Sequence, residues 1–178
     1  EDIGSAIEAA LNYVQMHPED VKFKHNLALT YAKNGIYARA LSLYTELLTQ
    51  DSNIAALNNY ANVLCEVDEF RKAIHIFDEA IAADVSISTA LLNKARCLER
   101  IGKDEAALRV IKQAIGVDNY DVKARCLAAL LLKSQGKIKE AVRMLNQATR
   151  VDPQAAEPLI LLSDVLIENG SFETAEVH

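Results

Sequence analysis

The sequence predicts an all-α protein built as a solenoid of antiparallel helix hairpins, and two observations carry this prediction. The 178-residue chain is 51% hydrophobic and 25% charged, but it holds only six Gly and three Pro. So few turn-forming residues argue against a sandwich or barrel of short strands and against a disordered chain. The second observation is a period of 34 residues, because four alanines follow one another at steps of 33, 34 and 34, namely Ala40, Ala73, Ala107 and Ala141.

Each repeat carries two helical patterns. In the first helix, small and apolar residues recur at i, i+1 and i+4, as in Leu27, Ala28 and Tyr31. In the second helix, the repeated alanine is followed four and seven residues later by larger residues, as in Tyr44 and Leu47. A residue suited to a left-handed turn stands five positions before each of these alanines and before Ala175, which continues the series, and is expected to end the first helix. These residues are Gly35, Asp68, Gly102, Gly136 and Gly170.

The period divides the chain into successive parts of a single solenoid domain. Because a hairpin cannot bury its apolar faces alone, the hairpins are expected to stack into a superhelix with a long concave surface. We predict the second helix of a truncated repeat at 1–20, four full repeats at 21–53, 54–87, 88–121 and 122–155, and a truncated fifth repeat at 156–178.

These residues resemble the tetratricopeptide repeat family over the whole chain. The stretch Asn26-Leu27-Ala28-x-x-Tyr31, followed by Gly35, Tyr37, Ala40, Tyr44 and Leu47, looks like a nearly complete copy of the family motif. The main departure is that no repeat has the family's Trp in its first helix, where Lys24, Leu57, Leu91, Arg125 and Leu159 stand. The resemblance implies a right-handed superhelix that binds proteins or peptides along the groove lined by the first helices.

Composition excludes several other classes of protein. The formal net charge is −6 and no basic tail is present, which argues against a nucleic-acid binder. No apolar run is long enough to insert into a membrane in this segment. Cys65, Cys97 and Cys126 lack close pairing and are expected to be free thiols, which favours the cytoplasm while leaving the compartment undetermined.

No catalytic site, cofactor site or metal site is predicted. The four histidines form neither H-E-x-x-H nor any pair at i, i+4, and the glycines stand singly at helix ends rather than in a phosphate-binding loop. The carboxylates at helix starts suit the helix dipole. We therefore expect the chain not to be an enzyme.

An asparagine recurs along the groove that the resemblance implies. Asn26, Asn59 and Asn93 take the sixth place of three successive repeats, where side-chain amides could pair with the backbone of an extended peptide, similar to the asparagine ladder of the O-GlcNAc transferase repeat domain. The alternative interpretation is that these asparagines fix neighbouring helices. Of the carboxylate clamp known from chaperone-binding members, Asn62, Asn93 and Lys123 are present, but two cations are missing, which disfavours a chaperone adaptor.

Basic residues also face the predicted groove, and they favour an acidic partner segment. The candidate ligand-binding residues are Asn26, Asn59, Asn62, Asn93, Arg96, Arg100, Lys123 and Lys133.

The sequence therefore predicts a non-catalytic scaffold that binds a protein or peptide in its concave groove. The alternative is a partner-recruiting arm of a larger enzyme of the glycosyltransferase type, or of a secretion, pilus or polysaccharide-export machine. Self-association through the truncated ends is a further expectation, because the end repeats lack neighbours.

Overall fold

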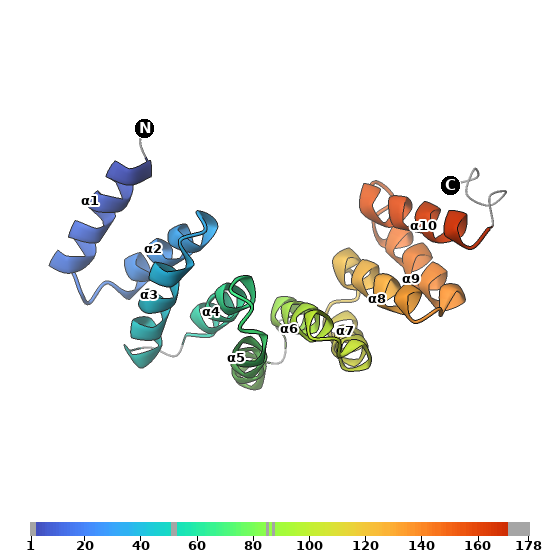
Figure 1. The fold of residues 1–178 in the computed structure, drawn as a ribbon, viewed down its shortest axis with the longest axis horizontal. Coiled ribbons are helices and arrows are strands. Elements are labelled where there is room, and N and C mark those ends of the chain that lie inside the picture. Colours follow the sequence, from blue (N-terminus) through green and yellow to red (C-terminus); the bar gives the residue numbers. More distant parts are fainter. Residues whose placement is uncertain (1–2, 51–52, 85, 87, 171–178) are drawn as a thin grey trace. The chain divides into compact units, whose positions relative to one another are not determined.

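The computed structural model describes residues 3–50, 53–84, 86 and 88–170. These residues form ten α-helices and no strand, which confirms the predicted all-α solenoid of helix hairpins (Figure 1). The helices are α1 (Ile3–Met16), α2 (Val21–Lys33), α3 (Tyr37–Gln50), α4 (Ile54–Glu66), α5 (Phe70–Ala83), α6 (Ser88–Arg100), α7 (Asp104–Val117), α8 (Val122–Ser134), α9 (Ile138–Val151) and α10 (Ala156–Glu168).

The chain divides into two compact units, residues 1–84 and 85–178. The first unit contains α1 to α5 and the second contains α6 to α10. Within the units, α2 packs against α3, α4 against α5, α6 against α7, and α8 against α9. Each of these hairpins is also joined to a neighbour in its own unit, because α3 packs against α4, α7 against α8, and α9 against α10.

The periodic alanines lie where the two helices of each hairpin meet. Ala40, Ala73, Ala107 and Ala141 are all completely buried, as is Ala28 on the facing helix of the first hairpin. An alanine at such a crossing lets the helix axes approach closely, and a larger neighbour fills the space beside it. The large neighbours in the second helices, Tyr44, Phe77, Ile111 and Leu145, are also completely buried.

The turn inside each hairpin has the predicted left-handed residue. Gly102 and Gly136 have φ angles of 73° and 71°, and Asp68 takes the same conformation at 62°. The residue after each turn donates its backbone N–H back to the helix that has just ended, as Lys137 does to the Leu132 carbonyl at 2.9 Å. The turn thereby satisfies a helix-end carbonyl that would otherwise lack a partner.

Two cations occupy the place where the family has Trp, and both are buried. Lys24 is 1% exposed and forms an ion pair with Glu46 of α3. Arg125 is 4% exposed, and its guanidinium donates to the Asn119 Oδ1 at 2.7 Å and to the Asp121 carbonyl at 3.2 Å. A buried charge is stable only with such partners.

The cysteines depart from the sequence-based expectation. Cys126 is a buried free thiol, and burial raises its pKa to about 11, with smaller contributions from Glu157 and Asp121. Cys65 and Cys97, in contrast, are disulfide-bonded, so the prediction of three free thiols was wrong for these two. The three cysteines show none of the short-range patterns from which sequence alone can predict a disulfide, so the sequence did not distinguish these two from Cys126. With two disulfide-bonded cysteines, the thiols no longer favour the cytoplasm.

Among the described helices, none combines the length and the apolar character that a membrane span requires.

Candidate functional site

The first helices α2 and α4 bring three of the predicted groove residues together in the first unit. Asn26 is exposed on α2, and the described residues offer its side chain no hydrogen-bond partner. Asn59 and Asn62 lie on α4 and are half-buried. Asn26 therefore has the free amide that a peptide-reading residue needs, whereas the Asn59 amide already has one partner.

The Asn59 amide is engaged within the protein. Its Nδ2 lies 3.2 Å from the Nε2 of His25, which belongs to the neighbouring first helix α2. Asn59 also lowers the pKa of the Tyr44 hydroxyl, although burial has the larger effect and raises that pKa to about 12. The Tyr44 hydroxyl has no hydrogen bond of ordinary geometry to any described residue. Asn59 thus has contacts of the kind that the helix-fixing interpretation expects, and the choice between the two interpretations stays a prediction.

The groove residues of the second unit come from α6 and α8. Asn93 is half-buried on α6, while Arg96 and Arg100 are exposed on the same helix. Lys123 is exposed in the first turn of α8. Within the described residues, neither Arg96 nor Lys123 has an ion-pair partner, so both cations are available to an acidic segment.

Lys133 differs from the other basic candidates. Its Nζ lies 2.7 Å from the Glu168 Oε1 of α10, and the Lys133 side chain is 25% exposed. This ion pair joins two successive first helices. Lys133 therefore has a partner inside the protein and contributes less to the attraction of an external anion.

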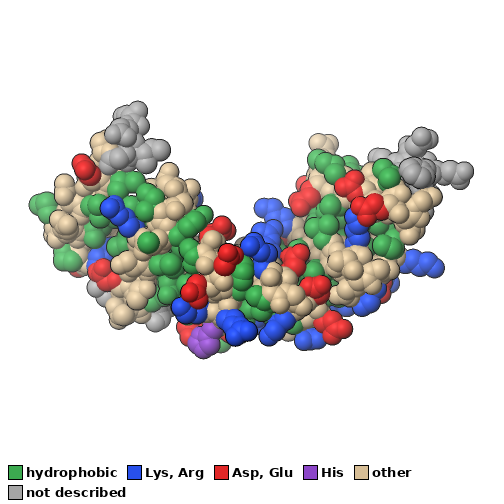
Figure 2. Space-filling view, in the orientation of Figure 1, with side chains coloured by type: hydrophobic (Ala, Val, Ile, Leu, Met, Phe, Trp, Pro, Cys, Tyr) green, Lys and Arg blue, Asp and Glu red, His purple; other side chains and the backbone are tan. Residues whose placement is uncertain are grey.

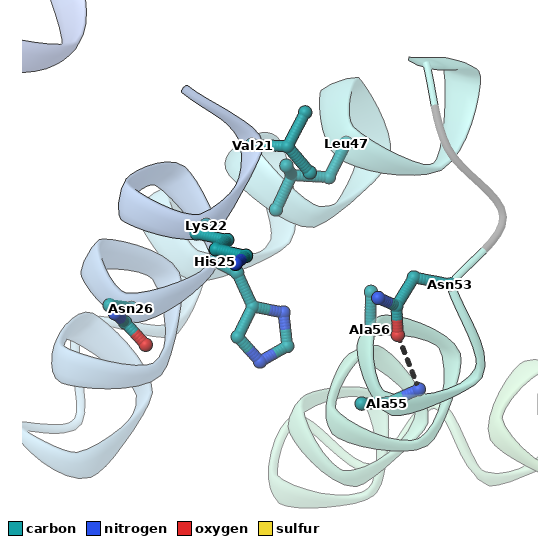
Figure 3. Close-up of a pocket in the computed structure, with 8 residues that line it drawn as sticks. All are labelled: Val21, Lys22, His25, Asn26, Leu47, Asn53, Ala55 and Ala56. Atoms are coloured by element: carbon teal, nitrogen blue, oxygen red, sulfur yellow. Dashed lines mark hydrogen bonds between the residues drawn. The ribbon is translucent and has the colours of Figure 1, made fainter. Parts of the chain in front are cut away.

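A pocket of the first unit lies between α2 and α4, and sequence reasoning missed most of its residues. It has a volume of about 290 Å³ and is lined by Val21, Lys22, His25, Asn26, Leu47, Asn53, Ala55 and Ala56. Figure 3 shows the His25 side chain projecting from α2 into the space between the two helices. Only Asn26 among these residues was predicted as a site residue. Lys22, His25 and Asn26 occupy the second, fifth and sixth places of their repeat, which the family resemblance assigns to the groove.

The described part of the chain contains no group of three or more His, Cys, Asp or Glu residues that could hold a metal ion. Figure 2 shows basic and acidic side chains interspersed over the visible face of α6 to α10, without a large patch of one sign there. The arrangement as a whole offers amides, separate cations and small apolar hollows, which are suited to contact a polypeptide.

Repeated helix hairpins that carry amides, cations and small apolar hollows on their first helices are typical of helical-repeat proteins that serve as interaction scaffolds. The tetratricopeptide repeat profile matches residues 1–53, 61–122 and 126–176, and the chain belongs to this family. Proteins of this family are typically non-catalytic scaffolds for protein interactions. No curated protein matches the chain in sequence.

Solved structures with the same fold cover nearly all of the chain. MamA (residues 41 to the end) from Desulfovibrio magneticus RS-1 is 18% identical, with a TM-score of 0.76 over 90% of this chain and 91% of that one. YrrB, described as a TPR protein with an unusual peptide-binding site, is 22% identical, with a TM-score of 0.70 over 95% and 88%. A tetratricopeptide repeat protein from Parabacteroides merdae is 22% identical, with a TM-score of 0.81 over 99% and 70%. At these identities the likeness concerns the fold.

Proposed function

We propose that this chain holds an extended segment of a partner protein against its first helices. The observation that carries the proposal is the pocket between α2 and α4, because three of its lining residues, Lys22, His25 and Asn26, stand at groove places of the repeat. The pocket combines an apolar floor with a polar rim, which is the usual composition of a site that anchors one side chain of a ligand. The peptide-binding site of YrrB, a protein of the same fold, is consistent with this function.

The exposed cations of the second unit favour an acidic partner segment. Arg96 and Lys123 have no ion-pair partner among the described residues, and Arg100 lies one turn beyond Arg96 on α6. Lys133 is neutralised by Glu168 and plays a smaller part. Such rim charges act mainly on the rate of association and on the choice of partner.

Selection from a displayed library of random 12-residue peptides tests the proposal. We expect the chain to enrich a family of peptides, and the Asn26→Ala/Asn93→Ala variant to bind them several-fold more weakly, since each lost hydrogen bond is worth about 1 kcal/mol. The matched control is Asn12→Ala, which removes an exposed amide from α1, outside the first helices of the full repeats. Unfolding in urea should be the same for all three proteins. Failure to enrich any peptide, or equal binding by the double variant and the wild type, would contradict the proposal.

The same groove would serve the alternative, a recruiting arm of a larger enzyme or of an export machine. The sequence on either side of this chain in its gene separates the two, because an adjoining glycosyltransferase or membrane component would select the second.

A further inference from the structure

The pocket between α2 and α4 has an apolar floor and a polar rim. Val21, Leu47 and Ala56 contribute the floor, and Leu47 and Ala56 are buried in the core beneath it. Lys22, Asn26 and Asn53 are exposed at the rim. Figure 3 shows Lys22 and Asn26 on the α2 side and Asn53 with Ala55 on the α4 side. The volume of about 290 Å³ suits one side chain better than a whole ligand of drug size.

The His25 ring is held from the neighbouring repeat by Asn59. The Asn59 Nδ2 lies 3.2 Å from the His25 Nε2. This contact involves one ring nitrogen only, so His25 lines the pocket with its Nδ1 not engaged by Asn59.

Aromatic packing holds this ring in place. The completely buried Tyr44 meets the His25 ring edge-on, with 5.8 Å between the ring centroids, and Tyr60 packs against Tyr44 from α4 at 6.2 Å. Burial raises the pKa of Tyr44 to about 12, so its hydroxyl stays neutral under all ordinary conditions. A ring that is fixed before binding loses little entropy when a ligand arrives.

The charge at the rim is positive. Lys22 is exposed, and none of the described residues that line the pocket is acidic. The carboxylate of Glu46, which immediately precedes Leu47, is held by the buried Lys24. The flexible Lys22 side chain can therefore reach a carboxylate of the ligand.

We propose that this pocket takes an aliphatic side chain from an extended partner segment that carries an acidic residue two positions away. This inference rests on the proposed function and specifies which segment the first unit selects. In an extended segment, residues i and i+2 point to the same side and lie about 7 Å apart. An aliphatic residue on the pocket floor therefore places the acidic residue over the rim, within reach of Lys22. The His25 ring lies beside the anchoring residue, and Asn59, which contacts the His25 Nε2, is the positioning residue that holds the ring there.

Blocking the pocket tests the aliphatic anchor. Ala55 is exposed and lines the pocket at the second residue of α4, so Ala55→Phe fills the pocket without overpacking the core. Ala38→Phe is the matched control, since Ala38 is also exposed and is the second residue of α3. The probes are synthetic 12-residue peptides, with free or amidated C-termini, that contain Leu-x-Glu, Ala-x-Glu or Leu-x-Lys in one common background.

We expect the wild type and Ala38→Phe to bind the Leu-x-Glu peptide equally, and Ala55→Phe to bind it about tenfold more weakly. Ala-x-Glu should lose about tenfold against Leu-x-Glu, and Leu-x-Lys a few-fold, with the second difference shrinking in high salt. Equal binding by Ala55→Phe, or binding that requires the free C-terminus, would overturn the inference. The general groove function would still stand if the library peptides depended on Asn26 and Asn93.

Asn59→Ala tests the positioning role. The variant removes the amide that lies 3.2 Å from the His25 Nε2 and leaves the ring held by Tyr44 alone. Asn12→Ala, which removes an exposed amide from α1, is the control. The ring chemical shifts of His25 should change in Asn59→Ala and stay as in the wild type in the control, with weaker peptide binding only in Asn59→Ala. An unchanged His25 spectrum in Asn59→Ala, or equal loss of binding in Asn12→Ala, would overturn this role.

Discussion

Lys24 in the first unit and Arg125 in the second stand at the fourth place of their repeats, yet the two buried cations are satisfied in different ways. Lys24 pairs with a carboxylate, Glu46, which is supplied by the second helix of the same hairpin. Arg125 is held by two neutral oxygens from the turn that precedes its own helix, and its Nε has no partner among the described residues. A repeat can therefore bury a cation in two ways. It can pair the cation with a carboxylate, or it can surround the cation with neutral oxygens that accept its hydrogen bonds.

The overall charge of the two units differs in a way that matches the two kinds of partner. The first unit contains 6 basic and 13 acidic residues, and the second contains 13 basic and 12 acidic residues. A carboxylate partner for a buried cation suits the acidic unit. In the nearly neutral unit, neutral oxygens leave the positive charge of Arg125 uncancelled, although its Nη1 and Nη2 atoms have partners.

The largest expected effect follows from removing the charge partner of Lys24. Glu46→Gln leaves the buried ammonium uncompensated and should cost about 2 kcal/mol of unfolding free energy. This lies below the 3–5 kcal/mol typical of breaking a buried pair, because Glu46 is half-exposed and water can reach it. Urea unfolding measures the loss. The double variant Lys24→Met/Glu46→Gln should recover most of it, and a double variant as unstable as Glu46→Gln alone would show that the charge is not the cause.

A smaller loss is expected in the second unit. Asn119→Ala removes the 2.7 Å acceptor of the Arg125 guanidinium and should cost about 1.5 kcal/mol, because hydrogen bonds to charged groups exceed neutral ones. Arg125→Met in the same background should abolish this difference. If Asn119→Ala is neutral in urea unfolding, the Asp121 carbonyl alone satisfies Arg125, and the two units differ more than described above.

The smallest effect concerns the turn residue inside a hairpin, which is Asp68 between α4 and α5 of the first unit and Gly136 between α8 and α9 of the second. Gly136 has φ 71°, and a Cβ at this position would meet open space, so Gly136→Ala should cost about 1 kcal/mol from backbone conformation alone. Gly136→Asn should cost less, as Asp68 already indicates. The control is Gly116→Ala inside α7, which also meets no neighbour and should stabilise by about 0.5–1 kcal/mol. Thermal unfolding that gives both alanine variants the same sign would contradict the conformational argument.

Much of the fold could be predicted from the sequence, because it follows from local periodicity. The alanine steps placed the hairpins, and the first helices α2, α4, α6, α8 and α10 begin at 21, 54, 88, 122 and 156, where the predicted frames open. The division into repeats itself stays a prediction. The left-handed turns were predictable because only a few residue types tolerate a positive φ.

The candidate site was less predictable, because it depends on contacts between repeats. His25 and Asn59 are 34 residues apart, and Lys133 and Glu168 are 35 apart. In each pair, the second residue stands one position further along its repeat than the first residue does in the preceding repeat. Aligning the repeats position by position therefore does not reveal these pairs. The asparagine pattern was visible when the repeats were aligned, because the asparagines share one position. The contact between Asn59 and His25 was not visible in this way, because the two residues stand at neighbouring positions of successive repeats.

The completely buried alanines at the hairpin crossings have an evolutionary consequence. They fix the spacing of the two helices with residues that never reach the first-helix surface, so mutations at the groove places leave the hairpin geometry intact. Selection can therefore change what the protein recognises one repeat at a time, at little risk to folding. The pocket at α2 and α4 and the exposed cations Arg96 and Lys123 of α6 and α8 belong to different repeats, so each can be lost or exchanged without the other.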